Sequence, residues 1–247
     1  MLTASQSGRI EVVLVSPRNP LNIGATARAI ANFGFFRLTV VAPYEPHWRE
    51  AKSAVQAESL LQNARCAQSL QEAIAGCTLV IGTGTLAHRK PEQPIIALPD
   101  LVPRIAEAGT GSGRIALVFG PEKRGLTRDD LALCHLLLHI PTDARQPSMN
   151  LGQAVAVCLY ELTRRPQLEP AGPEIDSSGT APATMRSLSL LADLVAQTMQ
   201  ASNYSPAAMQ KANRHDLNLL LRRLRLTQRD AGRITGLFRR ILWRLKH

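Results

Sequence analysis

Apolar and polar residues alternate in blocks along the first two thirds of the chain. Apolar runs typical of buried strands occur at residues 10–15, 36–41, 78–81, 115–119 and 136–140. Segments with helical spacing or helix-capping residues follow them, at 23–33, 50–62, 69–75, 101–108, 127–135 and from 151 onward. Strands that alternate with helices predict an α/β fold, with a mostly parallel sheet covered by helices on both faces.

Capping residues set the expected ends of several helices. We expect Asn22 to cap the helix over 23–33 and Gly34 to end it. Residues 86–99 contain prolines and predict a loop. Pairs of a hydroxyl residue and an acidic residue three positions later predict capping boxes at Ser69–Glu72, Thr127–Asp130 and Thr227–Asp230.

The pattern changes after residue 165. Residues 166–183 are rich in Pro, Gly and Ser and lack apolar periodicity, so we interpret them as a linker. Residues 184–247 return to helical spacing and predict a small helical bundle. The expected organisation is a domain over 1–165, a linker, and a helical C-terminal extension over 184–247.

Composition narrows the class of protein. The chain has 247 residues, of which 45% are hydrophobic and 19% charged, as is usual for a globular protein. No apolar run approaches the ~18 residues of a membrane span, and we see no signal peptide. Four scattered cysteines without a C-x-x-C pair favour reduced thiols over disulfides or a metal site. We expect a cytoplasmic protein without a metal or membrane partner.

The net charge of +10 is concentrated at the C-terminus. Residues 203–247 hold 11 of the 29 basic residues and two of the 19 acidic ones, a balance of +9. This indicates a polyanionic partner, and nucleic acid is the favoured one. The alternative is an ordinary solvated charged face. The candidate RNA-binding side chains, which we place off the apolar stripes, are Arg222, Arg225, Arg229, Arg233 and Arg240.

Three loops that follow predicted strands are candidates for a ligand site. They are Gly82–Thr85, Gly120–Gly125 and Thr142–Asn150, and in a parallel sheet they would gather at the carboxyl edge. Glycines there allow close backbone approach, and the helix after Asn150 would offer free N–H groups. The alternative is ordinary turns. The chain lacks both a G-x-x-x-x-G-K-[ST] loop and a G-x-G-x-x-G after its first strand, so the commonest nucleotide folds are not supported.

Two charged residues near these loops have both a structural and a functional interpretation. Arg28 would lie two turns inside an apolar helix, where it could be ion-paired, or could direct its guanidinium at a phosphate. Glu122 could serve as a partner of a helix N-terminus or as a site carboxylate.

Three motifs, in order along the chain, resemble those of a known family. They are N-x-x-x-x-x-R (22–28), FGPEKRGL (119–126) and IP…SMNLGQAVA (140–156). They are similar to motifs 1, 2 and 3 of the SPOUT RNA 2'-O-ribose methyltransferases, over residues 10–165. Within that superfamily the chain most resembles the TrmH-like branch and its TrmJ-type tRNA methyltransferases. That narrower resemblance depends on VLV-x-P-x-N-P-x-N-x-G-A-x-A-R-A and on the basic helical extension.

The resemblance implies a fold and a cofactor. The α/β domain would contain a C-terminal trefoil knot, a rare topology. The active unit would be a homodimer with each site built across the interface, and the substrate would be tRNA. S-adenosylmethionine would bind in the knot, at Thr83, Gly84, Thr85, Gly120, Ile140, Pro147, Ser148 and Met149. Pro147 departs from the family pattern and leaves the geometry of its loop open.

The resemblance also implies catalytic roles. Arg28 would activate the ribose 2'-hydroxyl. Because arginine is normally held protonated, it could instead position a phosphate and stabilise the developing alkoxide. Asn22, Glu122, Ser148 and Asn150 would orient the substrate, Arg28 and the knot. No metal is required, because methyl transfer from a sulfonium can proceed through positioning and electrostatics.

Several functions remain open from sequence. The TrmJ type would modify cytidine or uridine 32 of the anticodon loop. The same architecture serves other tRNA positions and ribosomal RNA. A non-enzymatic RNA-binding protein on this scaffold is a second hypothesis, and an unrelated nucleotide-binding α/β enzyme is a third.

Overall fold

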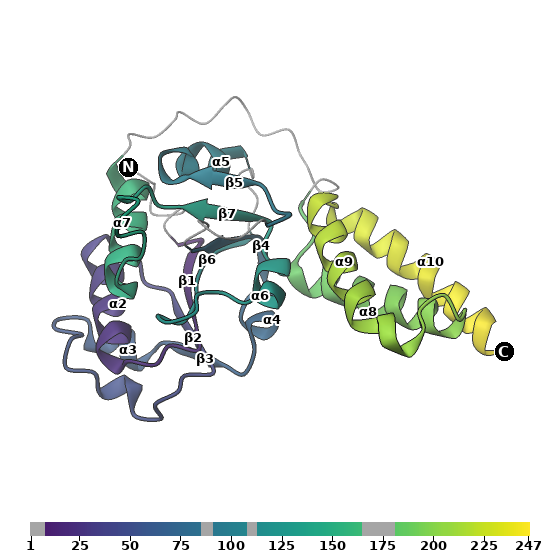
Figure 1. Cartoon of the computed structure of the whole chain (residues 1–247), viewed down its shortest axis with the longest axis horizontal. Coiled ribbons are helices and arrows are strands. Elements are labelled where there is room, and N and C mark those ends of the chain that lie inside the picture. The colour runs from purple at the N-terminus through teal and green to yellow at the C-terminus, as the bar shows by residue number, and fades with distance from the viewer. Residues whose placement is uncertain (1–7, 85–90, 108–112, 165–180) are drawn as a thin grey trace.

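A single parallel sheet forms the centre of the molecule. The computed structural model describes residues 8–84, 91–107, 113–164 and 181–247. In these ranges seven strands lie in the order β3-β2-β1-β6-β4-β7-β5, and every neighbouring pair is parallel (Figure 1). The predicted α/β fold with a parallel sheet is confirmed. The strands are β1 (Ile10–Val15), β2 (Leu38–Val41), β3 (Arg65–Ala67), β4 (Cys77–Thr83), β5 (Ile95–Ala97), β6 (Arg114–Phe119) and β7 (Leu136–His139).

Helices cover both faces of the sheet, as the alternating pattern predicts. Successive side chains of β1 show the two faces: Val12 and Leu14 lie in one apolar core, and Val13 and Val15 lie in the other. The first core packs against α2 (Pro20–Asn32), α3 (Glu58–Gln62), α5 (Leu101–Glu107) and α7 (Leu151–Arg164). The second packs against α4 (Leu70–Ala73) and α6 (Arg128–Ala132). Short 3-10 turns occur at Trp48–Glu50, Leu98–Asp100 and Ala207–Met209.

The C-terminal extension is helical and packs on the second face of the sheet. Met185, Leu188 and Ala231 are buried in the same core as α4 and α6. The extension therefore shares a core with the α/β body, which it joins at one end of the molecule (Figure 1). Its helices are α8 (Met185–Ala201), α9 (Gln210–Arg223) and α10 (Gln228–Lys246). None of the helices in the described ranges is both long and apolar enough to cross a bilayer.

The predicted linker falls mostly outside the described residues, which resume at residue 181. Its last residues are ordered by contacts with the helices. Pro182 forms an isolated antiparallel bridge with Thr227. Ala183 is buried, and its N–H donates to the carbonyl of Leu226. Residues 182 and 183 therefore pack where the chain enters α8, and the linker interpretation of 166–180 concerns residues outside the described ranges.

Four local expectations need correction. The helix expected over 50–62 is confined to α3, with a 3-10 turn before it. The loop expected over 86–99 contains β5. The helix expected over 127–135 ends at Ala132. Glu72 does not complete a capping box with Ser69, because its carboxylate accepts from the N–H of Gln68. Ser69 does cap α4, and the capping box of Thr127 and Asp130 is confirmed.

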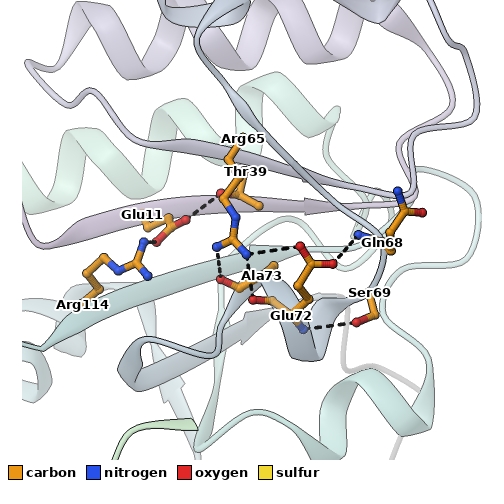
Figure 2. A network of polar contacts seen from close by, with 8 residues as sticks. All are labelled: Glu11, Thr39, Arg65, Gln68, Ser69, Glu72, Ala73 and Arg114. Atoms are coloured by element: carbon orange, nitrogen blue, oxygen red, sulfur yellow. Dashed lines mark hydrogen bonds and ion pairs between the residues drawn. The ribbon is translucent and has the colours of Figure 1, made fainter. Parts of the chain in front are cut away.

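A polar network ties the amino-terminal half of the sheet together (Figure 2). Glu11, which is 2% exposed, accepts hydrogen bonds from Thr39 Oγ1 at 2.6 Å and from Arg114 Nη1 at 2.9 Å. Arg65 on β3 donates to the backbone carbonyl and the carboxylate of Glu72 in α4. The first set of contacts joins β1, β2 and β6, and the second joins β3 to α4.

Candidate active site

The three candidate loops meet at one edge because their strands are neighbours. β6, β4 and β7 lie side by side in that order and point the same way, so the segments after their carboxyl ends converge. Between them lies a cavity of about 340 Å³, within the usual range for small ligands. Its lining includes the predicted residues Thr83, Gly84, Gly120, Glu122, Ile140, Pro147, Ser148 and Met149. Thr85, also predicted, lies outside the described residues.

Three side chains from three different motifs are hydrogen-bonded to one another beside this cavity. Asn22 Nδ2 donates to Glu122 Oε1 at 2.8 Å. Asn150 Nδ2 donates to Asn22 Oδ1 at 2.9 Å. The sequence placed these residues in a common site, and the structure brings them into direct contact across 100 and 128 positions of the chain. The cluster fixes the start of α2, the loop after β6 and the start of α7 relative to one another.

Asn22 does not cap α2, contrary to the expectation from sequence. The helix begins at Pro20, and the cap is Asn19, whose side chain accepts from the N–H of Leu21. Proline suits the first helical position because its missing N–H would have had no helical partner. With the cap supplied three residues earlier, both ends of the Asn22 amide are available to bind Glu122 and Asn150.

Glu122 is held in its ionised form. Partial burial raises its pKa, but hydrogen bonds donated by the Asn22 side chain and by the backbone N–H groups of Glu122, Arg18 and Asn19 outweigh burial and keep the pKa below its usual value. The two oxygens accept from Arg18 N at 3.2 Å and from Asn19 N at 3.3 Å, besides Asn22. A carboxylate so engaged is suited to hold the surrounding backbone in place.

Asn150 links the cluster to α7. Its Oδ1 accepts from the N–H groups of Gly152 at 2.9 Å and Gln153 at 3.4 Å, so it caps the helix while its Nδ2 binds Asn22. A Cβ added to Gly152 would lie 2.9 Å from the Cβ of Ala25 on α2. The absence of a side chain at 152 therefore allows α7 to approach α2 closely enough for the amide contact.

The loop after β6 has a conformation that depends on glycine. Gly125 has a φ of +63°, which residues with side chains rarely adopt. A Cβ at Gly120 would overlap with backbone atoms of Gly125 and Leu126, so the loop folds back on its own start. This compact loop presents backbone groups and Glu122 to the cavity.

The cavity combines an apolar wall with polar backbone. Leu137, Ile140 and Leu151 supply apolar surface, and the loops after β4, β6 and β7 supply backbone groups. The hydroxyl of Thr83 donates to the carbonyl of Val118 at 3.0 Å and so contributes to the architecture of the cavity. Within the described ranges, no group of three or more His, Cys, Asp or Glu residues could hold a metal ion.

Arg28 and Ser148 lie outside the hydrogen-bonded cluster. Arg28 is exposed on α2, about 120° around the helix axis from Asn22, and does not line the cavity. It makes no hydrogen bond or ion pair within the described part of the chain, so the ion-paired interpretation is not supported there. Ser148 is exposed at the rim of the cavity.

Several residues around the cavity were missed in the sequence. Lys123 and Thr142 line it, and Arg18 and Asn19 donate backbone hydrogen bonds to Glu122. Thr142 also donates from Oγ1 to the carbonyl of Pro147 at 3.3 Å, within the third loop. Lys123 and Thr142 lie inside loops that the sequence predicts, so their place in those loops could have identified them. The N–H groups of Arg18 and Asn19 could not be identified in this way, because a backbone donor does not depend on the type of residue.

The predicted RNA-binding arginines divide into two groups. Four of them, Arg225, Arg229, Arg233 and Arg240, are exposed on the C-terminal extension. Arg222 is 3% exposed, which corrects the expectation that it lies off the apolar stripes. It is buried because α9 places it against the α/β body, where burial lowers its pKa to about 10.

Comparisons with a family model and with curated proteins both point to RNA methyltransferases. Residues 9–160 match the SpoU rRNA Methylase family. Over 155 residues the chain is 39% identical to a Pseudomonas aeruginosa protein named tRNA (cytidine/uridine/adenosine-2'-O-)-methyltransferase TrmJ, covering 62% of this chain and 60% of that protein. Over 156 residues it is 38% identical to a Methanocaldococcus jannaschii protein named tRNA (cytidine-2'-O-)-methyltransferase TrmJ, covering 62% and 66%. The matched segment thus spans less than two thirds of the length of either relative.

A solved structure resembles almost the whole chain. The crystal structure of TrmJ from Z. mobilis superposes with a TM-score of 0.80 at 27% identity, covering 94% of this chain and 98% of that one. The crystal structure of a putative methylase family protein from Neisseria gonorrhoeae superposes with a TM-score of 0.62 at 28% identity, covering 75% of this chain and 93% of that one. The similarity to the first structure is too extensive to be confined to the α/β body, so it includes the C-terminal helices.

Proposed function

We propose, from the premise that this chain belongs to the SpoU rRNA methylase family, that it transfers a methyl group from S-adenosylmethionine to the 2'-hydroxyl of a ribose in tRNA. The observation that carries the proposal is the Asn22–Glu122–Asn150 cluster, which joins three motifs beside a ligand-sized cavity. The names of the similar proteins, 2'-O-methyltransferases of tRNA, support the substrate class.

The cavity fits S-adenosylmethionine in size and in the chemistry of its lining. Apolar side chains such as Leu137 and Ile140 suit a flat adenine ring, and backbone groups of three loops suit its polar edge and the ribose. The cofactor would supply a methyl group already activated by a sulfonium. Thr83, Gly84, Thr85, Gly120, Pro147 and Met149, with Ile140, would hold it, in a knotted arrangement of the last strands and α7.

The chain's own residues then have to orient the ribose. Glu122 stays ionised and keeps the loop after β6 attached to the start of α2 through Asn22. Asn150 keeps the start of α7 at the same place. Ser148, exposed at the rim, would contact the nucleotide directly. Such positioning can supply much of the rate enhancement when the reacting atoms are held in line.

Arg28 would act on the site of a second copy. Arg28 is exposed and does not line the cavity of its own chain, so its side chain is available to another protomer. A homodimer that builds each site across its interface would place Arg28 against the RNA phosphate and the developing alkoxide. Partners in this arrangement are tRNA and a second copy of the chain.

The exposed arginines of α10 would bind the RNA backbone. Arg229, Arg233 and Arg240 fall within about 40° of one another around the helix axis. The buried residues Ala231 and Leu242 lie on the opposite side of α10. The helix therefore packs by one face and presents a basic stripe on the other. By the TrmJ-type resemblance, the modified nucleotide is cytidine or uridine 32 of the anticodon loop.

The test is methyl transfer from labelled S-adenosylmethionine to unmodified total tRNA, followed by digestion and identification of the labelled nucleoside. A 2'-O-methylated pyrimidine in the anticodon loop is expected. Label at another tRNA position or in ribosomal RNA would overturn the substrate assignment and keep the chemistry. Tight RNA binding without transfer would favour the non-enzymatic alternative.

Arg28→Ala separates catalysis from binding in the same assay. We expect it to abolish turnover, while S-adenosylmethionine binding measured by calorimetry is retained, because Arg28 does not line the cavity of its own chain. Mixing Arg28→Ala with a variant defective in cofactor binding, such as Gly120→Ala, should restore part of the activity if sites are shared. No restoration in verified mixed dimers would contradict the shared-site arrangement.

A further inference from the structure

A second cavity lies at the opposite edge of the sheet from the candidate active site. It has a volume of about 390 Å³ and lies between the α/β body and the C-terminal helices. Thr78 and Leu79 of β4 and His135 and Leu136 at the start of β7 line it, so it sits at the amino ends of these strands. The candidate active site is at their carboxyl ends, so the two cavities are separate.

The charge of this second cavity is unbalanced. Arg222, Arg223 and Arg225 line it, and no Asp or Glu does so among the described residues. Arg222 is 3% exposed, and its Nε and Nη2 atoms have no hydrogen-bond partner. Its Nη1 makes only two long contacts of 3.3 Å, to the carbonyl and the side chain of Asn218 in its own helix.

Leaving a buried guanidinium unpaired is costly, because burial removes the water that would otherwise solvate its charge. Native structures seldom tolerate unsatisfied buried donors without a functional reason. An anion in the cavity would supply the missing acceptors and the missing negative charge. The unpaired donors of Arg222 thus point to a ligand that the chain does not provide within the described residues.

A neutral histidine adds a further donor. His135 Nδ1 accepts a hydrogen bond from the N–H of Val80 at 3.0 Å, so its proton lies on Nε2. Burial and the nearby Arg222 and Arg225 lower the pKa of His135 to about 3, which keeps the ring neutral. The neutral ring can donate to an anion without adding to the positive charge of the cavity.

We propose that this second cavity binds a phosphate ester, with Arg222 at its base and Arg223 and Arg225 at its exposed mouth. Several guanidinium groups suit a dianion with several acceptor oxygens. The cavity is larger than a phosphate group alone needs, and Leu79, Leu136 and Leu188 give it apolar surface for an attached ring. The ligand chemistry is a nucleoside phosphate, either a free nucleotide or a nucleotide of bound RNA.

Thermal unfolding of the full chain with and without adenosine monophosphate tests the site, in saturating S-adenosylmethionine so that adenine does not enter the first cavity, and against sodium chloride of the same ionic strength. We expect the wild type to gain roughly 3–6 °C in Tm at about ten times the Kd. Arg239→Met, an exposed arginine outside the cavity, is the matched control and should gain the same. Arg222→Met should show no gain, and its ligand-free Tm should equal or exceed that of the wild type because it lacks the unpaired charge.

The proposal would be overturned if adenosine monophosphate raised the Tm of the wild type no more than sodium chloride does. It would also be overturned if adenosine monophosphate raised the Tm of Arg222→Met as much as that of the wild type. Should Arg222→Met fail to fold, Arg223→Met keeps the test decisive, since its side chain is exposed. Calorimetry should then show adenosine monophosphate binding weakened by about tenfold or more, and unchanged affinity would refute the site.

The source of the phosphate is distinguished by saturating the protein with tRNA first. If an RNA nucleotide occupies the cavity, adenosine monophosphate no longer binds, and Arg222→Met weakens tRNA binding more than Arg239→Met does. If a free nucleotide is the ligand, it binds equally well to the tRNA complex. Both results keep the site, and neither depends on methyl transfer being the function.

Discussion

At the scale of single residues, Glu122 holds the segments around the candidate active site in place. It accepts hydrogen bonds from Asn22 and from two backbone groups. Glu122→Gln keeps the size but loses the charge and one acceptor oxygen, so the loop after β6 should shift. We expect methyl transfer to fall by roughly 100-fold, since small misplacements in a site cost about that much. Glu92→Gln, an exposed carboxylate elsewhere, should change the rate little.

The lowered pKa of Glu122 also predicts a pH dependence. Folding lowers the pKa of the Glu122 carboxyl below its ordinary value of 4.5. The contribution of the Glu122 carboxylate to stability is therefore complete above about pH 4.5, and it is lost as the pH falls through the lower pKa of the folded state. The Tm difference between wild type and Glu122→Gln should be constant from pH 5 to 7 and shrink below pH 4.5. A difference that grows on acidification would contradict this.

Gly120 tests the close approach of the loop to its own start. Gly120→Ala places a Cβ against backbone atoms of Gly125 and Leu126, which cannot move without displacing the loop. We expect S-adenosylmethionine binding to weaken at least tenfold and the free energy of unfolding to fall by about 1–3 kcal/mol. Gly236→Ala on α10, where a Cβ meets nothing within 4 Å, is the control. Calorimetry measures the affinity for S-adenosylmethionine, and urea unfolding measures the free energy of unfolding.

At the scale of elements, α2 shows how a cap positions a site residue. Asn19 caps the helix, and its own N–H donates to Glu122. Asn19→Ala removes only the side-chain cap and should cost about 1 kcal/mol of unfolding free energy. Asn32→Ala, exposed at the last residue of the same helix, should change stability by less than about 0.5 kcal/mol. Equal losses in urea unfolding would exclude a special role for the cap.

The start of α2 also shows what could be predicted from sequence. Asn19 and Asn22 are equally good caps by residue type, and Pro20 was the local signal that favours the earlier one. The Ala-rich stretch 51–57 favours a helix by propensity. It is not helical because it packs against α2 at Gly24, where a Cβ would lie 2.9 Å from the nitrogen of Ala54. Tertiary packing overrides propensity there.

The parallel sheet and the convergence of the loops were predictable because both follow from the order of strands and helices. The contacts within the site were not. The bonds of Asn22 to Glu122 and to Asn150 join positions 100 and 128 residues apart. The burial of Arg222 depends on how α9 docks on the body, which the polar and apolar pattern of one helix does not encode. The sequence therefore predicted which loops gather at this edge of the sheet more readily than the contacts between their side chains.

At the scale of the whole molecule, the nearly neutral α/β body and the basic C-terminal extension have different roles in the proposed enzyme. The body holds the cavity, and α10 presents its basic stripe of Arg229, Arg233 and Arg240 on the side away from its buried face. Arginines that neutralise RNA phosphates release counterions, so their contribution to affinity falls as salt rises. An ordinary solvated face would show no such effect on RNA binding.

Replacing the three arginines of this stripe together with glutamine separates these alternatives. Each phosphate contact contributes about 0.7–0.9 to the slope of log K against log salt concentration. The triple variant should lower that slope by about 2 and weaken tRNA binding most at low salt. Its S-adenosylmethionine affinity should be unchanged, because the stripe lies outside the cavity. An unchanged slope would assign the RNA-binding surface to another part of the molecule, since charge that never meets phosphate leaves the salt dependence as it was.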